Sequence, residues 1–289
     1  MRSLTDRQKR AFERNGFVVL RDAVDPELID AARKTVENDE TMTEGNQNEP
    51  AAATETIREM NRELFEYADD LVGGEQLHHP DDEDFGTFSG EQARIGLRYP
   101  DERQLSDPAA QESTEFGIHV DNPTDGDGGV YALGAATYLD SVGPRSGGFT
   151  VWPGSHWITA EYLEPTGENE DAPPGTRSRA SDVRLRDDAP FEDMTELFEL
   201  FSPFEVAGGP GTVTLWHANL IHSGGRHLAP GPVRMAAFSR FHVEPGRVAL
   251  EEAMANPLDH WEGVGNGDVD SAALDEAFET FERGLRGAD

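Results

Sequence analysis

The chain has 289 residues, enough for one large domain or two small ones, and a formal net charge of −33 from 57 acidic and 24 basic residues. This excess of carboxylates argues against non-specific nucleic-acid binding, which depends on neutralising phosphates with Lys and Arg. The chain has no cysteine, which excludes disulfides, thiolate metal sites and cysteine nucleophiles.

The acidic surface carries few lysines, because only Lys9 and Lys34 among the 24 basic residues are lysines. Such a surface is typical of a protein that stays hydrated in concentrated salt, where screening reduces the self-repulsion of the chain. We therefore expect a halophilic protein, with an ordinary acidic cytosolic protein as the alternative. No apolar run approaches the ~20 residues of a membrane span, and the start has no signal-peptide core. These features predict a cytoplasmic protein without a membrane partner; they leave the oligomeric state open.

The first hundred residues predict helices that alternate with short strands. A helix capped by Thr5 ends at Gly16, and the stretch "FVVL" that follows is typical of a strand. A second helix is expected to start near Asp25, where the following proline suits the first turn. Residues 53–72 predict a third helix, and "ARIGLRYP" predicts another strand.

The middle of the chain predicts an all-β architecture. Residues 116–156 and 203–244 consist of short apolar or alternating stretches separated by Gly and Pro. Strands at this spacing favour an antiparallel sandwich or barrel. Between them, a charged segment at about 160–200 is expected to be an insertion, and a lid over an active site is one role for it. Pro153 to His156 is expected to form a turn.

One sequence pattern is typical of a metal site. A mononuclear iron(II) site of the oxygenase type needs two imidazoles and one carboxylate on one face of the metal. Residues i and i+2 of a strand share a face, so a His-x-Asp pair on a strand supplies two of these ligands. Four pairs of the relaxed form His-x-Asp/Glu occur: His79/Asp81, His119/Asp121, His242/Glu244 and His260/Glu262.

The context favours His119 and Asp121, because they lie in an apolar stretch that further strand segments follow. A third ligand must come from a distant strand. His217, His222 and His227 are all candidates on chemistry alone, and a hydrogen-bonded structural histidine is the alternative for each.

Four stretches together resemble the phytanoyl-CoA dioxygenase family of iron(II)/2-oxoglutarate oxygenases over most of residues 4–244. They are "LTDRQKRAFERNGFVVLRDAVDPELI", "IHVD", "SGGFTVWPGSH" and "GPGTVTLWHANLIHSGGRHLAPGPVR". The resemblance implies a mainly β fold, a double-stranded β-helix (jelly-roll, cupin-like) core with flanking N-terminal helices. Residues 1–289 then form a single domain, with an oxygenase core at 4–244 and an acidic, partly helical C-terminal extension at 245–289.

The same resemblance implies the roles of individual residues. His119, Asp121 and His222 are the metal ligands and the catalytic centre. Arg234 takes the place of the arginine that binds the far carboxylate of 2-oxoglutarate, for which a guanidinium fork is suited. Thr137 falls where the family often has a side chain near this cosubstrate.

The activity that the resemblance implies is hydroxylation of a C–H bond in a small-molecule substrate, with iron(II), 2-oxoglutarate and O2, and release of succinate and CO2. Related halogenating enzymes have a small residue in place of the carboxylate of Asp121, so hydroxylation is expected. A non-catalytic or isomerase-type cupin-fold binding protein is the alternative, because fold alone does not give function. Arg94 and Arg98 share a strand face and suit an anionic ligand, although ion pairing with carboxylates is the favoured interpretation. The substrate itself stays open.

Overall fold

The computed structural model describes residues 2–39, 45–47, 55–78, 94–100, 118–121, 129–165, 183–191, 196 and 201–264. The predicted C-terminal helix lies beyond residue 264, and most of the charged insertion also lies outside the described residues. Neither prediction is therefore addressed by the structure.

The three N-terminal helices form as the sequence predicts. Helix α1 (Asp6–Asn15) begins at Thr5, whose side chain accepts from the backbone of Gln8 in a reciprocal capping box, and it ends at Gly16 in the left-handed region at φ 74°. The other two are α2 (Pro26–Glu37), capped by Asp25, and α3 (Glu55–Val72).

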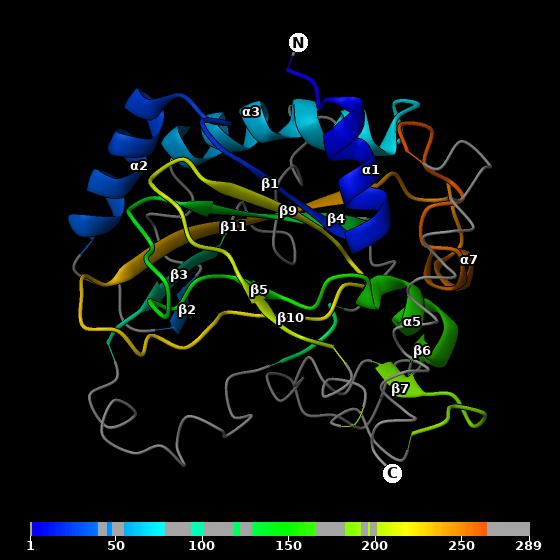
Figure 1. The fold of residues 1–289 in the computed structure, drawn as a ribbon. Helices are drawn as coiled ribbons and strands as arrows, with labels where there is room; N and C mark the ends of the chain where they lie inside the picture. Colours follow the sequence, from blue (N-terminus) through cyan, green and yellow to red (C-terminus); the bar gives the residue numbers. More distant parts are fainter. Residues whose placement is uncertain are drawn as a thin grey trace.

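Two antiparallel sheets face each other and form the jelly roll (Figure 1). The large sheet has the order β1-β9-β4-β11-β3-β2, and the small sheet has the order β10-β5-β8. The strands of the large sheet are β1 (Phe17–Leu20), β2 (Gly45–Gln47), β3 (Arg94–Arg98), β4 (Val130–Tyr138), β9 (Val213–His217) and β11 (Arg234–Val243). Those of the small sheet are β5 (Thr150–Val151), β8 (Phe204–Glu205) and β10 (His222–Ser223), and β6 (Leu163–Pro165) pairs with β7 (Val183–Leu185).

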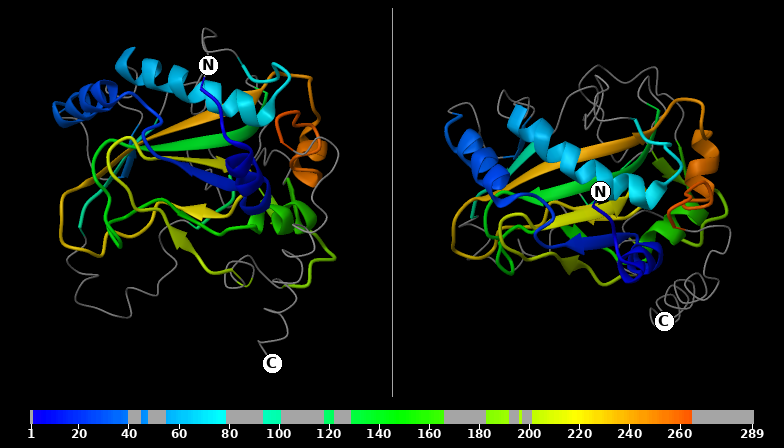
Figure 2. Two further views of the ribbon diagram at one scale, coloured as in Figure 1. Left: turned by 45° about the horizontal axis from the view of Figure 1, so that its top comes forward. Right: turned by 90° about the horizontal axis from the view of Figure 1, so that it is seen from above.

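The outer face of the large sheet is covered by the N-terminal helices, as the two further views in Figure 2 show. Helix α3 buries Ile57, Met60 and Leu64 at helical spacing in one apolar core with Leu133 and Ala237 of the sheet. Burial of this continuous apolar surface fixes the large sheet against the helices and leaves its other face for the site.

The inner face of the large sheet encloses the barrel interior together with the small sheet. Phe149 and Val151 from the small-sheet side pack there against Trp216 and Ala236. Gly134 on β4 makes room for the indole, because a Cβ at this position would lie 2.2 Å from Cζ2 of Trp216. The interior is therefore shaped around one large aromatic side chain.

Two local features differ from the sequence predictions. Gly154 turns the chain at φ 82°, but helix α5 (Ser155–Tyr162) begins directly after it, where only a turn was expected. The packed core also continues past residue 244, through α7 (Leu250–Ala255) to Val264, because Trp261 stacks on Phe12 at 5.6 Å between ring centroids. Among the described helices, none is both long and apolar enough to cross a membrane.

Candidate metal centre

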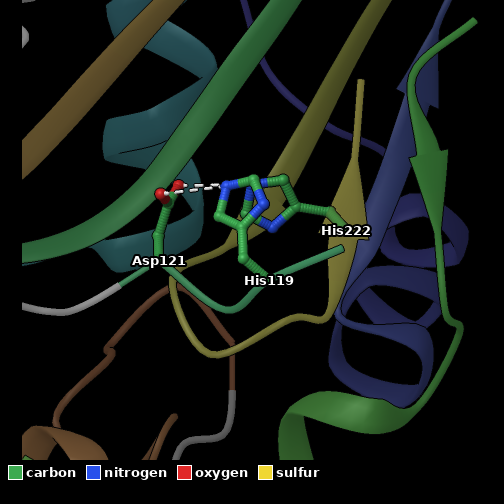
Figure 3. A group of neighbouring side chains, drawn as sticks. All are labelled: His119, Asp121 and His222. Carbon is green, nitrogen blue, oxygen red and sulfur yellow. Dashed lines mark ion pairs between the residues drawn. The ribbon is translucent and has the colours of Figure 1, made fainter. Parts of the chain in front are cut away.

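Backbone pairing brings His119 next to His222. The amide of His119 donates to the carbonyl of His222 at 3.0 Å, and the amide of His222 donates back to the carbonyl of His119 at 2.9 Å. This isolated antiparallel bridge joins the segment 118–121 to β10, which itself pairs with β5. The bridge places both imidazoles on one side, with ring centroids 4.3 Å apart (Figure 3).

Asp121 completes a three-residue cluster with the two histidines. Nε2 of His119 lies 3.7 Å from Oδ1 of Asp121, and Nε2 of His222 lies 3.4 Å from Oδ2. One ligand atom from each residue falls within 4.8 Å of the others. Two atoms that bind one divalent ion at about 2.1 Å from adjacent octahedral positions lie about 3 Å apart. The cluster therefore fits a single metal ion of the 2-His-1-carboxylate type.

The imidazole of His222 is held in the form that a metal ligand needs. Its Nδ1 donates to the carbonyl of Leu220 at 2.9 Å, so Nε2 keeps its lone pair toward Asp121. Burial, and then the neighbouring His119, lower the pKa of His222 to about 3. The ring is therefore neutral at neutral pH, and no proton competes with a metal cation for its Nε2.

Asp121 is 2% exposed and is the only carboxylate among the buried residues that the structure describes. Nη2 of Arg240 lies 2.5 Å from its Oδ1, and the hydroxyl of Tyr131 donates to its Oδ2 at 3.3 Å. The guanidinium of Arg240 also lies over the Tyr131 ring, 4.6 Å from its centroid. Charge-assisted hydrogen bonding of this kind holds a buried carboxylate in one orientation.

The structure distinguishes among the three histidines that chemistry alone left as candidates for the third metal ligand. His217 donates from Nε2 to the carbonyl of Pro257 at 2.8 Å and accepts at Nδ1 from the amide of Asn219, so both ring nitrogens are used. His227 donates to the carbonyl of Pro232. Only His222 joins the cluster, in agreement with the register that the resemblance implies.

Arg234 is 2% exposed on the inner face of β11. It donates to three backbone carbonyls: Nε to Gly147 at 2.8 Å, Nη1 to Gly96 at 3.2 Å and Nη2 to Gly224 at 2.9 Å. Burial, with Arg98 as the second cause, lowers the pKa of Arg234 to about 9, so the group remains a cation at neutral pH.

The structure does not bring Thr137 to the site. Thr137 pairs with Ala237 on β11 and Val213 on β9, and both of these pack in the helix-covered core on the outer face. Its neighbour Tyr138 is on the inner face, opposite Ala236. The placement of Thr137 beside the cosubstrate is therefore corrected, because one step along a strand exchanges the two faces.

Sequence reasoning missed three residues of the interior: Tyr131, Trp216 and Arg240. Arg240 had a usable signal, because it stands an even number of residues after Arg234 in the alternating stretch "RMAAFSRFHV". Tyr131 had none, since a β-bulge between Phe241 and His242 sets its pairing.

The profile of the family described as phytanoyl-CoA dioxygenase (PhyH) matches residues 12–236. The chain belongs to the phytanoyl-CoA dioxygenase family. With the His-Asp-His cluster in place, this member of the family is an iron(II)- and 2-oxoglutarate-dependent dioxygenase.

Individual relatives agree with the family assignment. The ectoine dioxygenase of Sphingopyxis alaskensis is 25% identical over 276 residues, which cover 88% of this chain and 81% of that protein. Two solved structures share the fold. The α-ketoglutarate-dependent epimerase SnoN has a TM-score of 0.52 at 17% identity, covering 87% of this chain and 89% of SnoN. The carbocyclase SnoK has a TM-score of 0.51 at 15% identity, covering 84% of this chain and 87% of SnoK.

Proposed function

We propose that this member of the phytanoyl-CoA dioxygenase family hydroxylates an unactivated C–H bond of a small molecule, and that it consumes 2-oxoglutarate and O2 and releases succinate and CO2. The observation that carries the proposal is the location of His119, Asp121, His222 and Arg234 in one barrel interior. A metal-binding module without catalysis would need no arginine in the same interior to bind the carboxylate of a cosubstrate.

His119, Asp121 and His222 would hold the iron(II). Three protein ligands on one face leave the remaining positions open to the cosubstrate and O2. The bound iron supplies the oxygen activation and C–H oxidation, and the protein supplies binding, orientation and electrostatics. The fixed tautomer of His222 and the oriented carboxylate of Asp121 are this chain's contribution to that centre.

Arg234 would bind the distal carboxylate of 2-oxoglutarate. A guanidinium has five N–H donors, and three backbone carbonyls use three of them. The two that remain can grip one carboxylate while the backbone keeps the group in place. Arg98 stands opposite Arg234 in the β3–β11 register, and both guanidinium groups lie against Gly224, so Arg98 adds a second positive charge at the same carboxylate.

Asp121 supports hydroxylation over halogenation, because its carboxylate occupies the place that a halide would need. We expect Asp121→Ala to abolish hydroxylation and to allow some chloride binding at the metal. Asp121→Glu should keep at most weak activity, since one added methylene displaces the carboxylate from a site whose geometry the barrel sets. Product analysis by mass spectrometry in the presence of chloride tests both variants. Full activity of Asp121→Ala would remove the carboxylate from this role.

The decisive experiment measures succinate. The purified protein with iron(II), 2-oxoglutarate and O2 is incubated with a metabolite extract and, because of the ectoine dioxygenase relative, with ectoine as a first single substrate. We expect succinate release that rises with the substrate and a weak visible band when 2-oxoglutarate is added to the anaerobic iron(II) protein. Product formation without 2-oxoglutarate would instead identify an isomerase-type cupin protein.

We further propose that the enzyme works in a cytoplasm of high salt. The net charge of −33 creates self-repulsion that salt screens over a Debye length of about 3 Å at 1 M and about 10 Å at 0.1 M. The melting temperature should therefore rise as potassium chloride is increased from 0.1 M to 1 M and beyond. A melting temperature that is independent of salt would favour an ordinary acidic protein.

A further inference from the structure

Two polar side chains on the inner face of β9 are buried without a hydrogen-bond partner in the described part of the chain. Trp216 is 2% exposed and has an unpartnered Nε1–H, and Thr214 is 1% exposed and has an unpartnered hydroxyl. The two residues are i and i+2 of one strand, so they share its face, and Trp216 packs in the barrel interior. A buried polar group left unpartnered costs free energy, so two of them on one face indicate that a polar ligand binds beside β9.

The indole N–H of Trp216 lies at the metal end of the interior. The strand register places Trp216 opposite Gly134 and Gly134 opposite Arg240, so the three form one row across the large sheet. A Cβ at Gly134 would lie 2.5 Å from Cε2 of Trp216, the atom bonded to Nε1, so the N–H is close to this glycine. Arg240 contacts Asp121, and the ring centroid of Trp216 is 5.3 Å from that of His222. The unpartnered donor is therefore a neighbour of the metal centre.

Aromatic rings connect this donor to the arginine of the cosubstrate site. The guanidinium of Arg234 lies 5.7 Å from the ring centroid of Phe238. The Phe238 centroid is 6.4 Å from that of Trp216 and 6.1 Å from that of Phe149. Phe149 in turn lies 5.3 Å from His222 between ring centroids. A ligand that extends from Arg234 to the metal centre therefore runs along these rings and ends beside Trp216.

The length of 2-oxoglutarate matches this path. Phe238 and Arg240 are i and i+2 of β11, a step of about 7 Å along a strand. The carboxylate carbons of an extended five-carbon diacid are about 5 Å apart. Because the guanidinium of Arg234 reaches the Phe238 ring, a diacid held by it extends from there to the row of Trp216. The second carboxylate then lies where a donor is unpartnered.

We propose that Trp216 binds the cosubstrate, and that its indole N–H donates a hydrogen bond to the carboxylate of 2-oxoglutarate at the metal end, opposite the carboxylate held by Arg234. This inference rests on the proposed function, because it presumes that Arg234 binds the far carboxylate. A hydrogen bond to an ionised carboxylate in a buried site is a strong one, so it fixes the orientation of the ligand as well as its affinity. The two ends of the cosubstrate are then held from two different strands, β11 and β9.

The test removes the N–H and keeps the shape of the side chain. One variant is Trp216→Phe, and a second carries 3-benzothienylalanine at this position alone, with sulfur in place of the indole N–H. Each anaerobic iron(II) protein is titrated with 2-oxoglutarate, and binding is followed by calorimetry and by the visible band. We expect both variants to bind 2-oxoglutarate roughly 10- to 100-fold more weakly than the wild type. If Trp216→Phe does not fold, the sulfur isostere decides the matter.

Oxalate shows which end of the cosubstrate the N–H contacts. This two-carbon diacid can chelate the metal as a 2-oxo acid does, and it is too short to reach Arg234 as well. The sulfur isostere at Trp216 should weaken oxalate by roughly the same factor as 2-oxoglutarate. Arg234→Lys should weaken 2-oxoglutarate and leave the affinity for oxalate unchanged. A sulfur isostere that binds oxalate as tightly as the wild type does would overturn the assignment to the metal end.

The matched control is Trp157→Phe. Trp157 is also a buried tryptophan, but its Nε1–H already donates to the carbonyl of Glu13 at 3.2 Å in the helix-covered core. This variant should bind both ligands as the wild type does. Unchanged affinity for 2-oxoglutarate in the sulfur isostere would overturn the proposal, as would an equal loss in Trp157→Phe. Failure of the proposed function is seen separately, because the wild-type iron(II) protein would then show no band that depends on 2-oxoglutarate.

Discussion

His222 and Asp121 lie next to each other in the barrel interior, with Nε2 of the imidazole 3.4 Å from Oδ2 of the carboxylate. The two residues come from segments far apart in the chain, and the backbone bridge between His119 and His222 aligns them. Strand pairing thus builds the site. Each ligand can be tested by substitution, with a nearby residue of the same type that is not a ligand as the control.

His222→Ala should reduce the affinity for iron(II) by more than about 100-fold, since loss of a group that merely orients a metal ligand already costs about 10- to 100-fold. The matched control is His217→Gln, which changes a buried histidine of the same motif that bonds only to backbone groups. Its iron affinity should stay within a few-fold of the wild type. Metal titration of both variants checks this. A greater loss of iron(II) affinity in His217→Gln than in His222→Ala would mean that the third ligand is assigned to the wrong histidine.

Arg234→Lys should raise the KM for 2-oxoglutarate by roughly 10- to 100-fold, because an ammonium cannot form the fork that grips a carboxylate. Thr137→Val is the control, since Thr137 points into the helix-covered core and should leave this KM unchanged. Initial rates at varied 2-oxoglutarate give both values. An unchanged KM for 2-oxoglutarate in Arg234→Lys would show that Arg234 does not bind the cosubstrate. A raised KM in Thr137→Val would show that Thr137 does lie beside it.

Gly134→Ala should destabilise the protein by roughly 1–3 kcal/mol, because the new methyl group collides with the buried ring of Trp216. The displaced indole should also lower the turnover rate, since its ring centroid lies 5.3 Å from that of His222. Gly209→Ala is the control, because nothing lies within 4 Å of a Cβ there. Urea unfolding measures the difference, and equal stability of the two variants would contradict the packing account.

Mild acid should destabilise the fold through two buried histidines on the far side of the sheet. Burial lowers the pKa of His217 to about 3, and burial followed by the nearby His217 lowers the pKa of His156 well below its ordinary value. The unfolded chain therefore takes up protons near pH 6.5 that the folded chain does not. The free energy of unfolding falls as pH drops from about 6.5 toward 3, by up to about 1.4 kcal/mol per pH unit for each histidine.

The matched measurement compares the pH dependence of urea unfolding of metal-free wild type with that of His217→Gln between pH 7 and pH 5. The variant should show a shallower loss of stability than the wild type, whatever its stability at pH 7. This comparison cancels the titration of the many surface carboxylates, which both proteins share. Parallel curves would show that His217 does not contribute.

The sequence by itself determined the kinds of element and most of their positions. Thr5, Gly16 and Asp25 act on their own neighbourhood through caps and a left-handed turn, and the structure has each helix end where they predict it. The pair His119 and Asp121 was also readable, because strand alternation alone puts residues i and i+2 on one face.

Only the tertiary structure decided which distant groups meet. The pairing of His119 with His222, the outward side chain of Thr137 and the contact of Arg240 with Asp121 all depend on the register between strands that are remote in sequence. A bulge in the β4–β11 pairing moves Tyr131 onto the carboxylate, and no local pattern encodes it. The physical reason is that side chains alternate with a period of two, so a shift of one residue in register moves a side chain from the core to the site.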